Sequence, residues 1–197
     1  MLNFKNIINY LEFINISTDD QSIFEWKPPN SYKSYMLDLN IVKQNRMSNI
    51  FFHLNKGNLK IVHIRKDKLI YSAGATNELQ FQLLEALIEY ISKKFYEIWD
   101  VDYVLSYENF TPTVFNAFKN NVHEIIKDFH TLDLVKVIHV ECMVCEKLLP
   151  LIVKVSLIKN AESYPVPIVF DHLGHSILCY IDKNFQVRGV ELVNKTG

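Results

Sequence analysis

Two short pairs of residues have the types and the spacing that a metal ion requires. Cys142 and Cys145 are separated by two residues, and His172 and His175 repeat that spacing after 26 intervening residues. Structural zinc takes four cysteine or histidine ligands in a tetrahedron, and two such residues in one tight turn can reach a single ion. The two pairs therefore predict a structural zinc site in which each pair is supplied by one turn.

Three other interpretations of the cysteine pair stay open. The first is two buried core cysteines with surface histidines, and Glu146 favours it because a zinc-binding turn commonly has glycine there. The second, a redox pair, needs a strand-to-helix junction, whereas the residues after Cys145, EKLLPLIVKV, are typical of a strand. The third, a catalytic zinc, needs an open coordination position that four protein ligands do not leave.

The segments around both pairs have the composition of β-strands. Five apolar runs lie between residues 133 and 197, namely VKVIHV, LPLIVKVSLI, VPIVF, SILCYI and VRGVELV. Such runs predict a small β-rich module over 133–197, with a short helix near Ile158 to Ser163. A module of this size is marginally stable from its core alone, so bound zinc would add to its folding free energy.

The preceding residues, 1–130, predict a separate α+β domain. Apolar residues at helical spacing over residues 4–15 predict a short amphipathic helix, followed by a proline-containing connection, EWKPPNSYKSY. From Met36 to Ala75 the pattern predicts an antiparallel meander of four strands, whose runs are MLDLNIV, NIFFHL, LKIVHI and KLIYSAG.

The clearest helix of the chain follows this meander. Asn77 is a predicted N-cap, with Gln80 three residues later. An apolar residue then recurs at every fourth position: Leu79, Leu83, Leu87, Ile91 and Phe95. A strand is predicted from Val101 to Tyr107, and a second helix from Thr111-Pro112 to about Phe129. The apolar face of that helix comprises Phe115, Phe118, Val122, Ile125, Ile126 and Phe129.

The composition limits the classes of function. The chain has 197 residues, 49% of them apolar and 22% charged, and a formal net charge of −1, which offers no field that would attract nucleic acid. No apolar run has the length of a transmembrane helix. Three cysteines do not make a disulfide framework, so we expect a cytoplasmic protein. A basic hairpin, with Lys56, Lys60, Arg65, Lys66 and Lys68, is either an anion-binding surface or simply solvated.

The stretch from about residue 50 to 129 resembles the longin-type domains of clathrin-adaptor sigma chains and of some SNAREs. The likeness is carried by a hairpin, a helix, a following segment and a second helix in that order, with these motifs: Asn77-Glu78-Leu79, Tyr90-Ile91, Lys93-Lys94-Phe95 and Asp102 to Phe110. A longin domain opens with two strands and a helix. This chain is instead predicted to open with a helix, so residues 1–50 depart from the longin order. Related roadblock domains start with a helix, and this part of the chain is closer to them. The end of the chain also resembles a C-terminal segment of archaeal proteins, which implies no activity.

The resemblance implies an α+β fold of the longin, roadblock or profilin-like kind, with an antiparallel sheet flanked by amphipathic helices. It further implies a protein-binding adaptor or regulator in trafficking, without catalytic residues. The expected partner is a small GTPase or another longin or roadblock chain, including a second copy of this one, and the partner would bring the chain to membranes. Two other hypotheses are a zinc- or thiol-dependent enzyme using the C-terminal module, and a sensor of a small ligand.

Overall fold

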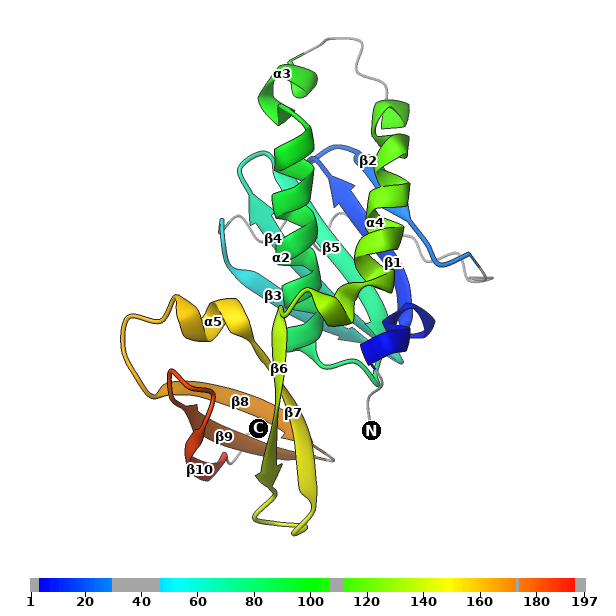
Figure 1. Ribbon diagram of the computed structural model, residues 1–197. Helices are drawn as coiled ribbons and strands as arrows, with labels where there is room; N and C mark the ends of the chain where they lie inside the picture. Colours follow the sequence, from blue (N-terminus) through cyan, green and yellow to red (C-terminus); the bar gives the residue numbers. More distant parts are fainter. Residues whose placement is uncertain (1–3, 30–46, 107–111, 173, 194–197) are drawn as a thin grey trace. The chain divides into compact units, whose positions relative to one another are not determined.

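The computed structural model describes residues 4–29, 47–106, 112–172 and 174–193 (Figure 1). The chain divides into two compact units, residues 2–132 and residues 133–197. The fold is α+β, as predicted, with antiparallel sheets in both units. Within the described ranges, no helix combines the length and the apolar character that crossing a bilayer requires.

The first unit is built on a five-stranded antiparallel sheet of order β2-β1-β5-β4-β3. The strands are β1 (Leu11–Ser17), β2 (Ser22–Trp26), β3 (Phe51–Lys56), β4 (Leu59–Lys66) and β5 (Leu69–Thr76). Two-residue turns join β3 to β4 and β4 to β5, with Gly57 and Asp67 at positive φ as such tight turns require. Three predicted strands of the meander are confirmed, whereas the run MLDLNIV lies outside the described residues.

The predicted helix over residues 4–15 is wrong. A 3-10 helix, η1 (Phe4–Asn9), is followed by strand β1, which pairs with β2 on one side and β5 on the other. Both faces of β1 are buried, with Phe13 on one face and Ile14 and Ile16 on the other. Because the apolar residues of β1 lie on both faces, they do not show the simple alternation of a half-buried strand, and their spacing also fits a helix.

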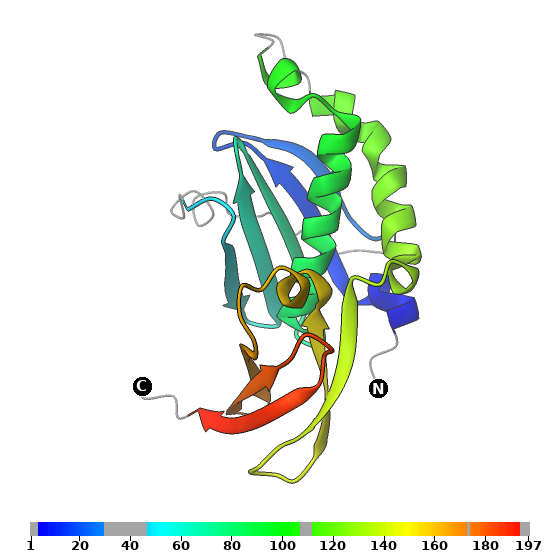
Figure 2. The same cartoon turned by 60° about the vertical axis from the view of Figure 1, so that its left-hand side comes forward.

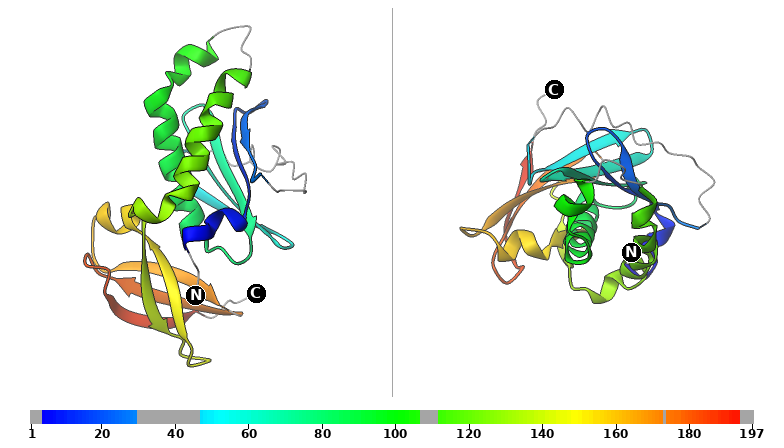
Figure 3. Two further views of the ribbon diagram at one scale, coloured as in Figure 1. Left: turned by 45° about the vertical axis from the view of Figure 1, so that its right-hand side comes forward. Right: turned by 90° about the horizontal axis from the view of Figure 1, so that it is seen from above.

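Two helices cover one face of this sheet, α2 (Phe81–Ile98) and α4 (Phe118–Lys127) (Figure 3). The predicted stripe of α2 is confirmed, since all five of its apolar residues are at most 1% exposed. The predicted N-cap is wrong: Gln80 occupies the cap position and makes no side-chain capping bond, and Asn77 Nδ2 donates instead to the carbonyl of Gly57. Tertiary burial of the stripe, rather than a local cap, therefore sets where α2 begins.

The segment after α2 is helical, not the predicted strand. Helix α3 spans Val101–Leu105, and Asp100 Oδ1 accepts the backbone N–H of Tyr103 at 3.0 Å, as an N-cap carboxylate does. Pro112 then begins the 3-10 helix η2 (Pro112–Ala117), which leads into α4 and a final turn, η3 (Phe129–Thr131). Thr111, where the second helix was predicted to start, lies outside the described residues.

The predicted face of α4 and its flanking turns enters the core of the unit. Five of its six residues are buried and Ile125 is half-buried. Phe95 of α2 contacts Phe115 and Phe118, and Phe118 also contacts Phe24 of β2, with ring centroids 4.9 to 5.4 Å apart. This aromatic cluster joins both helices to the β2 side of the sheet.

The second unit contains two small antiparallel sheets (Figure 2). One pairs β6 (Val135–Glu141) with β7 (Leu148–Lys154), and the other has the order β10-β9-β8. Its strands are β8 (Val166–His172), β9 (His175–Ile181) and β10 (Val187–Val193). A strand is confirmed in each of the five predicted runs, but the run LPLIVKVSLI is a strand only as far as Lys154. The short helix, α5 (Val155–Lys159), both begins and ends earlier than predicted. The two sheets share one hydrophobic core.

Candidate functional site

The Cys142–Glu146 turn closes the β6–β7 hairpin. The N–H of Cys142 donates to the carbonyl of Lys147 at 2.9 Å, and the N–H of Glu146 donates back to the carbonyl of Cys142 at 2.8 Å. Glu146 has φ +57°, the left-handed conformation that glycine adopts most readily. Position 146 thus adopts a conformation that suits glycine, although the residue there is glutamate.

The hydrogen bonds within this turn favour a thiolate at Cys142. Its sulfur accepts the backbone N–H groups of Cys145 and Val144, and these bonds lower the pKa of the Cys142 thiol although its burial acts in the opposite direction. The side chain of Cys145 adds a further hydrogen bond to the same sulfur. Cys179 is different, because burial raises the pKa of its thiol to about 11. The pair, and not Cys179, is therefore the candidate ligand set.

The two predicted histidines lie at the turn of the β8–β9 hairpin. His172 and His175 are the last paired positions of its register, and Gly174 between them has φ +83°. Their side chains lie outside the described part of the structure. Among the side chains that are described, no group of three or more histidine, cysteine, aspartate or glutamate residues could hold a metal ion. The four-residue zinc site therefore stays a prediction.

The hypothesis of a thioredoxin-like redox pair loses support from the element that follows. The chain after Cys145 enters strand β7 at Leu148, as predicted, and not a helix. A helix N-terminus is what lowers the thiol pKa in such redox motifs. Here the backbone N–H groups of a hairpin turn take that role instead.

The basic hairpin makes contacts within its own unit. Lys60 Nζ donates to the carbonyls of Asn77 and Leu79, and Arg65 pairs with Asp19 at 2.6 Å. Lys66 Nζ donates to Ser92 Oγ at 2.7 Å, whereas Lys56 is exposed. Lys60, Arg65 and Lys66 are thus engaged within the unit, which makes the hairpin a weaker candidate for an anion-binding surface.

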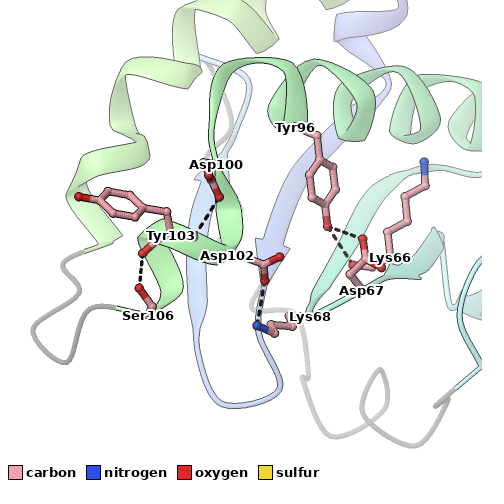
Figure 4. Close-up of polar contacts among 8 residues, drawn as sticks. All are labelled: Lys66, Asp67, Lys68, Tyr96, Asp100, Asp102, Tyr103 and Ser106. Atoms are coloured by element: carbon pink, nitrogen blue, oxygen red, sulfur yellow. Dashed lines mark hydrogen bonds and ion pairs between the residues drawn. The ribbon is translucent and has the colours of Figure 1, made fainter.

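The turn between β4 and β5 is tied to the end of α2 and to α3 (Figure 4). Lys68 Nζ lies 2.8 Å from Asp102 Oδ1. The hydroxyl of Tyr96 lies 3.2 Å from the carbonyl of Lys66 and 3.3 Å from Asp67 Oδ2. Burial and the negative charge of Asp67 raise the pKa of Tyr96 to about 12, so this phenol stays protonated and can donate. The arrangement positions the helices and has no nucleophile activated by a base.

A row of buried polar residues on the sheet face opposite α2 was missed by the sequence reasoning. Asn15, Ser72 and His63 are cross-strand neighbours on β1, β5 and β4, and Ser17 and Arg65 lie beside them. All five are at most 9% exposed. The signal was available, because these polar residues alternate with apolar ones in strands otherwise rich in Ile, Val and Leu.

Four polar atoms of this row make no hydrogen bond in the part of the chain that the structure describes: Asn15 Oδ1, Ser17 Oγ, Ser72 Oγ and Arg65 Nε. Each buried polar atom that is left without a hydrogen-bond partner lowers the stability of the folded state by about 1–3 kcal/mol. Burial, and then the charges of His53 and Arg65, lower the pKa of His63 to about 4, so its imidazole is neutral near pH 7. The row is chemically suited to holding polar groups of a ligand.

Comparison with known proteins adds no family to these observations: no protein-family profile matches the chain, and no curated protein is detectably similar to it.

Proposed function

We propose that the first unit is a non-catalytic binding platform of the longin or roadblock kind. One observation carries the proposal: a five-stranded antiparallel sheet of order β2-β1-β5-β4-β3, with α2 following β5 and burying a continuous stripe on one sheet face. The paired strands β1 and β2 that open the unit also support it, since a longin domain opens with two strands. The partner is a small GTPase or a longin or roadblock chain, including a second copy.

The edge strand β3 is the part of the platform best suited to a partner. Among the strands that the structure describes, it lies at one end of the sheet order, and its residues Asn55 and Lys56 are exposed. Two large apolar side chains just before it, Met47 and Ile50, are 54% and 45% exposed. An edge strand beside exposed apolar side chains is a template for an added strand of another chain.

The opposite edge is less suited to this role. Strand β2 has five residues, and Phe24 in it contacts the ring of Phe118 from α4. Ile23 and Trp26 are buried as well. We therefore assign the docking edge to β3, and the expected partner segment is an extended strand with apolar side chains.

The test is a binding measurement on the full chain. The protein is titrated against a panel of small GTPases in both nucleotide states and against longin and roadblock chains, and its own molar mass is followed by light scattering over a range of concentrations. We expect saturable binding to one class, or a dimer at micromolar concentration. A protein that stays monomeric and binds no member of the panel would overturn the proposal.

A second candidate function is a sensor of a small polar ligand, favoured by the unsatisfied polar atoms opposite α2. A ligand that supplied the missing hydrogen bonds would stabilise the folded state by mass action. In a thermal-shift screen of small polar metabolites, a true ligand raises the unfolding midpoint of the wild type more than that of Ser72→Ala. Equal shifts in both proteins, or no shift with any compound, would exclude this function.

A further inference from the structure

We propose that the buried polar row on the sheet face opposite α2 binds a small uncharged molecule through an amide-like edge, in which one N–H group lies beside one C=O group. The row comprises Asn15 and Ser17 of β1, Ser72 of β5, and His63 and Arg65 of β4. This inference rests on the second candidate function, the sensor of a small polar ligand, and names the chemical class of its ligand.

Strand pairing places the polar groups of the row within reach of one small molecule. Asn15 lies directly opposite Ser72, and Ser72 lies directly opposite His63. Residues directly opposite each other in an antiparallel pair have Cα atoms about 4.5–5.5 Å apart. Ser17 and Arg65 stand on the next rung of the same face, about 7 Å further along the strands. Two neighbouring rungs of the sheet thus present polar side chains at a spacing that a single small molecule can span.

The orientation of the Asn15 amide is fixed by its neighbours. Asn15 Nδ2 donates to Ser22 Oγ at 2.6 Å, and Ser22 Oγ in turn donates to the carbonyl of Phe24 at 3.5 Å. Because the hydroxyl of Ser22 uses its one proton on that carbonyl, it accepts from Asn15, and the amide nitrogen is the atom that faces it. Asn15 Oδ1 then makes no hydrogen bond within the described part of the chain. It is a buried acceptor that requires a donor.

The other unsatisfied groups of the row can all donate. The hydroxyls of Ser17 and Ser72 and the Nε–H of Arg65 make no hydrogen bond within the described ranges. The guanidinium of Arg65 is held in place by Asp19, whose Oδ1 accepts from Nη2 at 2.6 Å. Hydroxyls also accept, whereas a guanidinium only donates. A ligand therefore needs an acceptor for Arg65 and a serine hydroxyl, and a donor for Asn15 Oδ1, and an amide-like edge has both on neighbouring atoms.

The charges around the row favour an uncharged ligand over an anion. Arg65 already has a counter-ion in Asp19. Burial, and then the charges of His53 and Arg65, lower the pKa of His63 to about 4, which leaves its imidazole neutral at pH 7. An anion bound here would lose its hydration without meeting an uncompensated cation, and a neutral amide loses far less hydration on burial.

Apolar side chains border the polar row. Phe13 and Ile61 occupy the adjacent rung on the same face, where the ring of Phe13 lies over Gly74. The ring of Phe52 stacks on that of His63, with ring centroids 5.2 Å apart. Hydrogen bonds are stronger in such a low-dielectric environment than in water. The border therefore suits a compact amide with a small apolar or aromatic body.

The test measures binding of two matched pairs of probes to the full chain by isothermal calorimetry: nicotinamide with nicotinate, and benzamide with benzoate. The members of each pair differ only in an amide or a carboxylate. We expect saturable binding of the amides and weaker binding of the acids. Ser72→Ala should weaken amide binding about tenfold through the loss of one hydrogen bond. The matched control is Ser92→Ala, which should bind like the wild type because Ser92 is a fully buried serine of α2, outside the row.

Three outcomes would overturn the inference: acids that bind as tightly as the amides, equal affinity of the wild type and Ser72→Ala for the amides, or no binding of either amide. The sensor function itself fails only if the wider screen of polar metabolites also finds no ligand. A ligand of another chemical class in that screen would reject the amide-like edge and keep the sensor function, so the two failures are distinguishable.

A second measurement, made without ligand, covers the case in which Ser72→Ala fails to bind because it misfolds. Removing an unsatisfied buried hydroxyl removes an unfavourable contribution to the folded state. Ser72→Ala should therefore unfold at the same temperature as the wild type or at a higher one. Ser92→Ala should unfold at a lower temperature, because the hydroxyl of Ser92 donates to the carbonyl of Glu89. A lower unfolding temperature for Ser72→Ala would show that its hydroxyl has a partner in the folded chain, and would reject the site.

Discussion

The ring of Phe13 occupies the space where a side chain at position 74 would lie. A Cβ on Gly74 would come within 2.2 Å of Phe13 Cε1, and Phe13 is only 2% exposed, so its ring has little room to move. We expect Gly74→Ala to destabilise the first unit by about 1–3 kcal/mol through overpacking. The free energy of unfolding in urea measures this change.

A double-mutant cycle separates this contact from a general effect of losing glycine in a strand. In a Phe13→Leu background the smaller side chain leaves space for the new methyl group, so Gly74→Ala should cost less than in the wild type. Additive free energies for the two substitutions would show that the ring is not the cause.

His63 should make the stability of the protein depend on pH. Its pKa is about 4 in the folded state, against 6.5 in the unfolded chain, so between these values the unfolded state binds the extra proton. Stability is therefore fully present above about pH 6.5 and falls by about 1.4 kcal/mol per pH unit as the pH drops towards 4. Denaturation curves collected across this range measure the slope.

The matched control for His63 is the same substitution at an exposed histidine. His63→Gln should flatten the pH dependence between 6.5 and 4, whereas His130→Gln should leave it unchanged because His130 is exposed. If both variants keep the slope of the wild type, another group causes the pH dependence.

At the scale of elements, helix α2 holds the first unit together. Leu87 is fully buried at the centre of its stripe, so Leu87→Ala should cost about 2–5 kcal/mol by removing apolar contacts and leaving a cavity. Lys93 lies on the exposed side of the same helix, and Lys93→Ala should change stability by about 0.5 kcal/mol or less. Thermal or chemical unfolding of both variants tests the assignment of faces, and equal losses would refute it.

Elements with a clear period were predictable from the sequence, and elements set by tertiary contacts were not. The stripe of α2 and the strands β3 to β10 follow directly from apolar patterning. Strand β1 was mistaken for a helix because it is buried on both faces. Helix α3 was mistaken for a strand because VDYVL has β-forming residues, while Asp100 supplies the local bond that starts the helix.

The two candidate sites also differ in how far the sequence could predict them. Spacing alone located Cys142 and Cys145, because metal ligands within one turn are local in sequence. The polar row of Asn15, His63 and Ser72 was missed because it exists only after three strands pair in a particular register. Cross-strand proximity of this kind depends on strand order, which a single sequence does not encode in its local pattern.

At the scale of the whole molecule, the two units should respond differently to metal removal. If zinc joins the sheets of the second unit, a chelator should increase amide hydrogen exchange in β6 to β10 and leave β1 to β5 unchanged. Mass spectrometry of exchanged peptides locates the change. Equal increases in both units, or none in either, would show that no metal stabilises the second unit selectively.

The most direct test of the binding platform is a titration of the full chain with its strongest binder from the panel of small GTPases, longin and roadblock chains and its own copy. Asn55→Lys places a charge on the exposed edge of β3, and Asn120→Lys makes the same change on the exposed side of α4. We predict that Asn55→Lys weakens binding about tenfold or more, equivalent to about 1.4 kcal/mol, while Asn120→Lys leaves it unchanged. Identical affinities for the wild type and both variants would contradict a docking edge at β3.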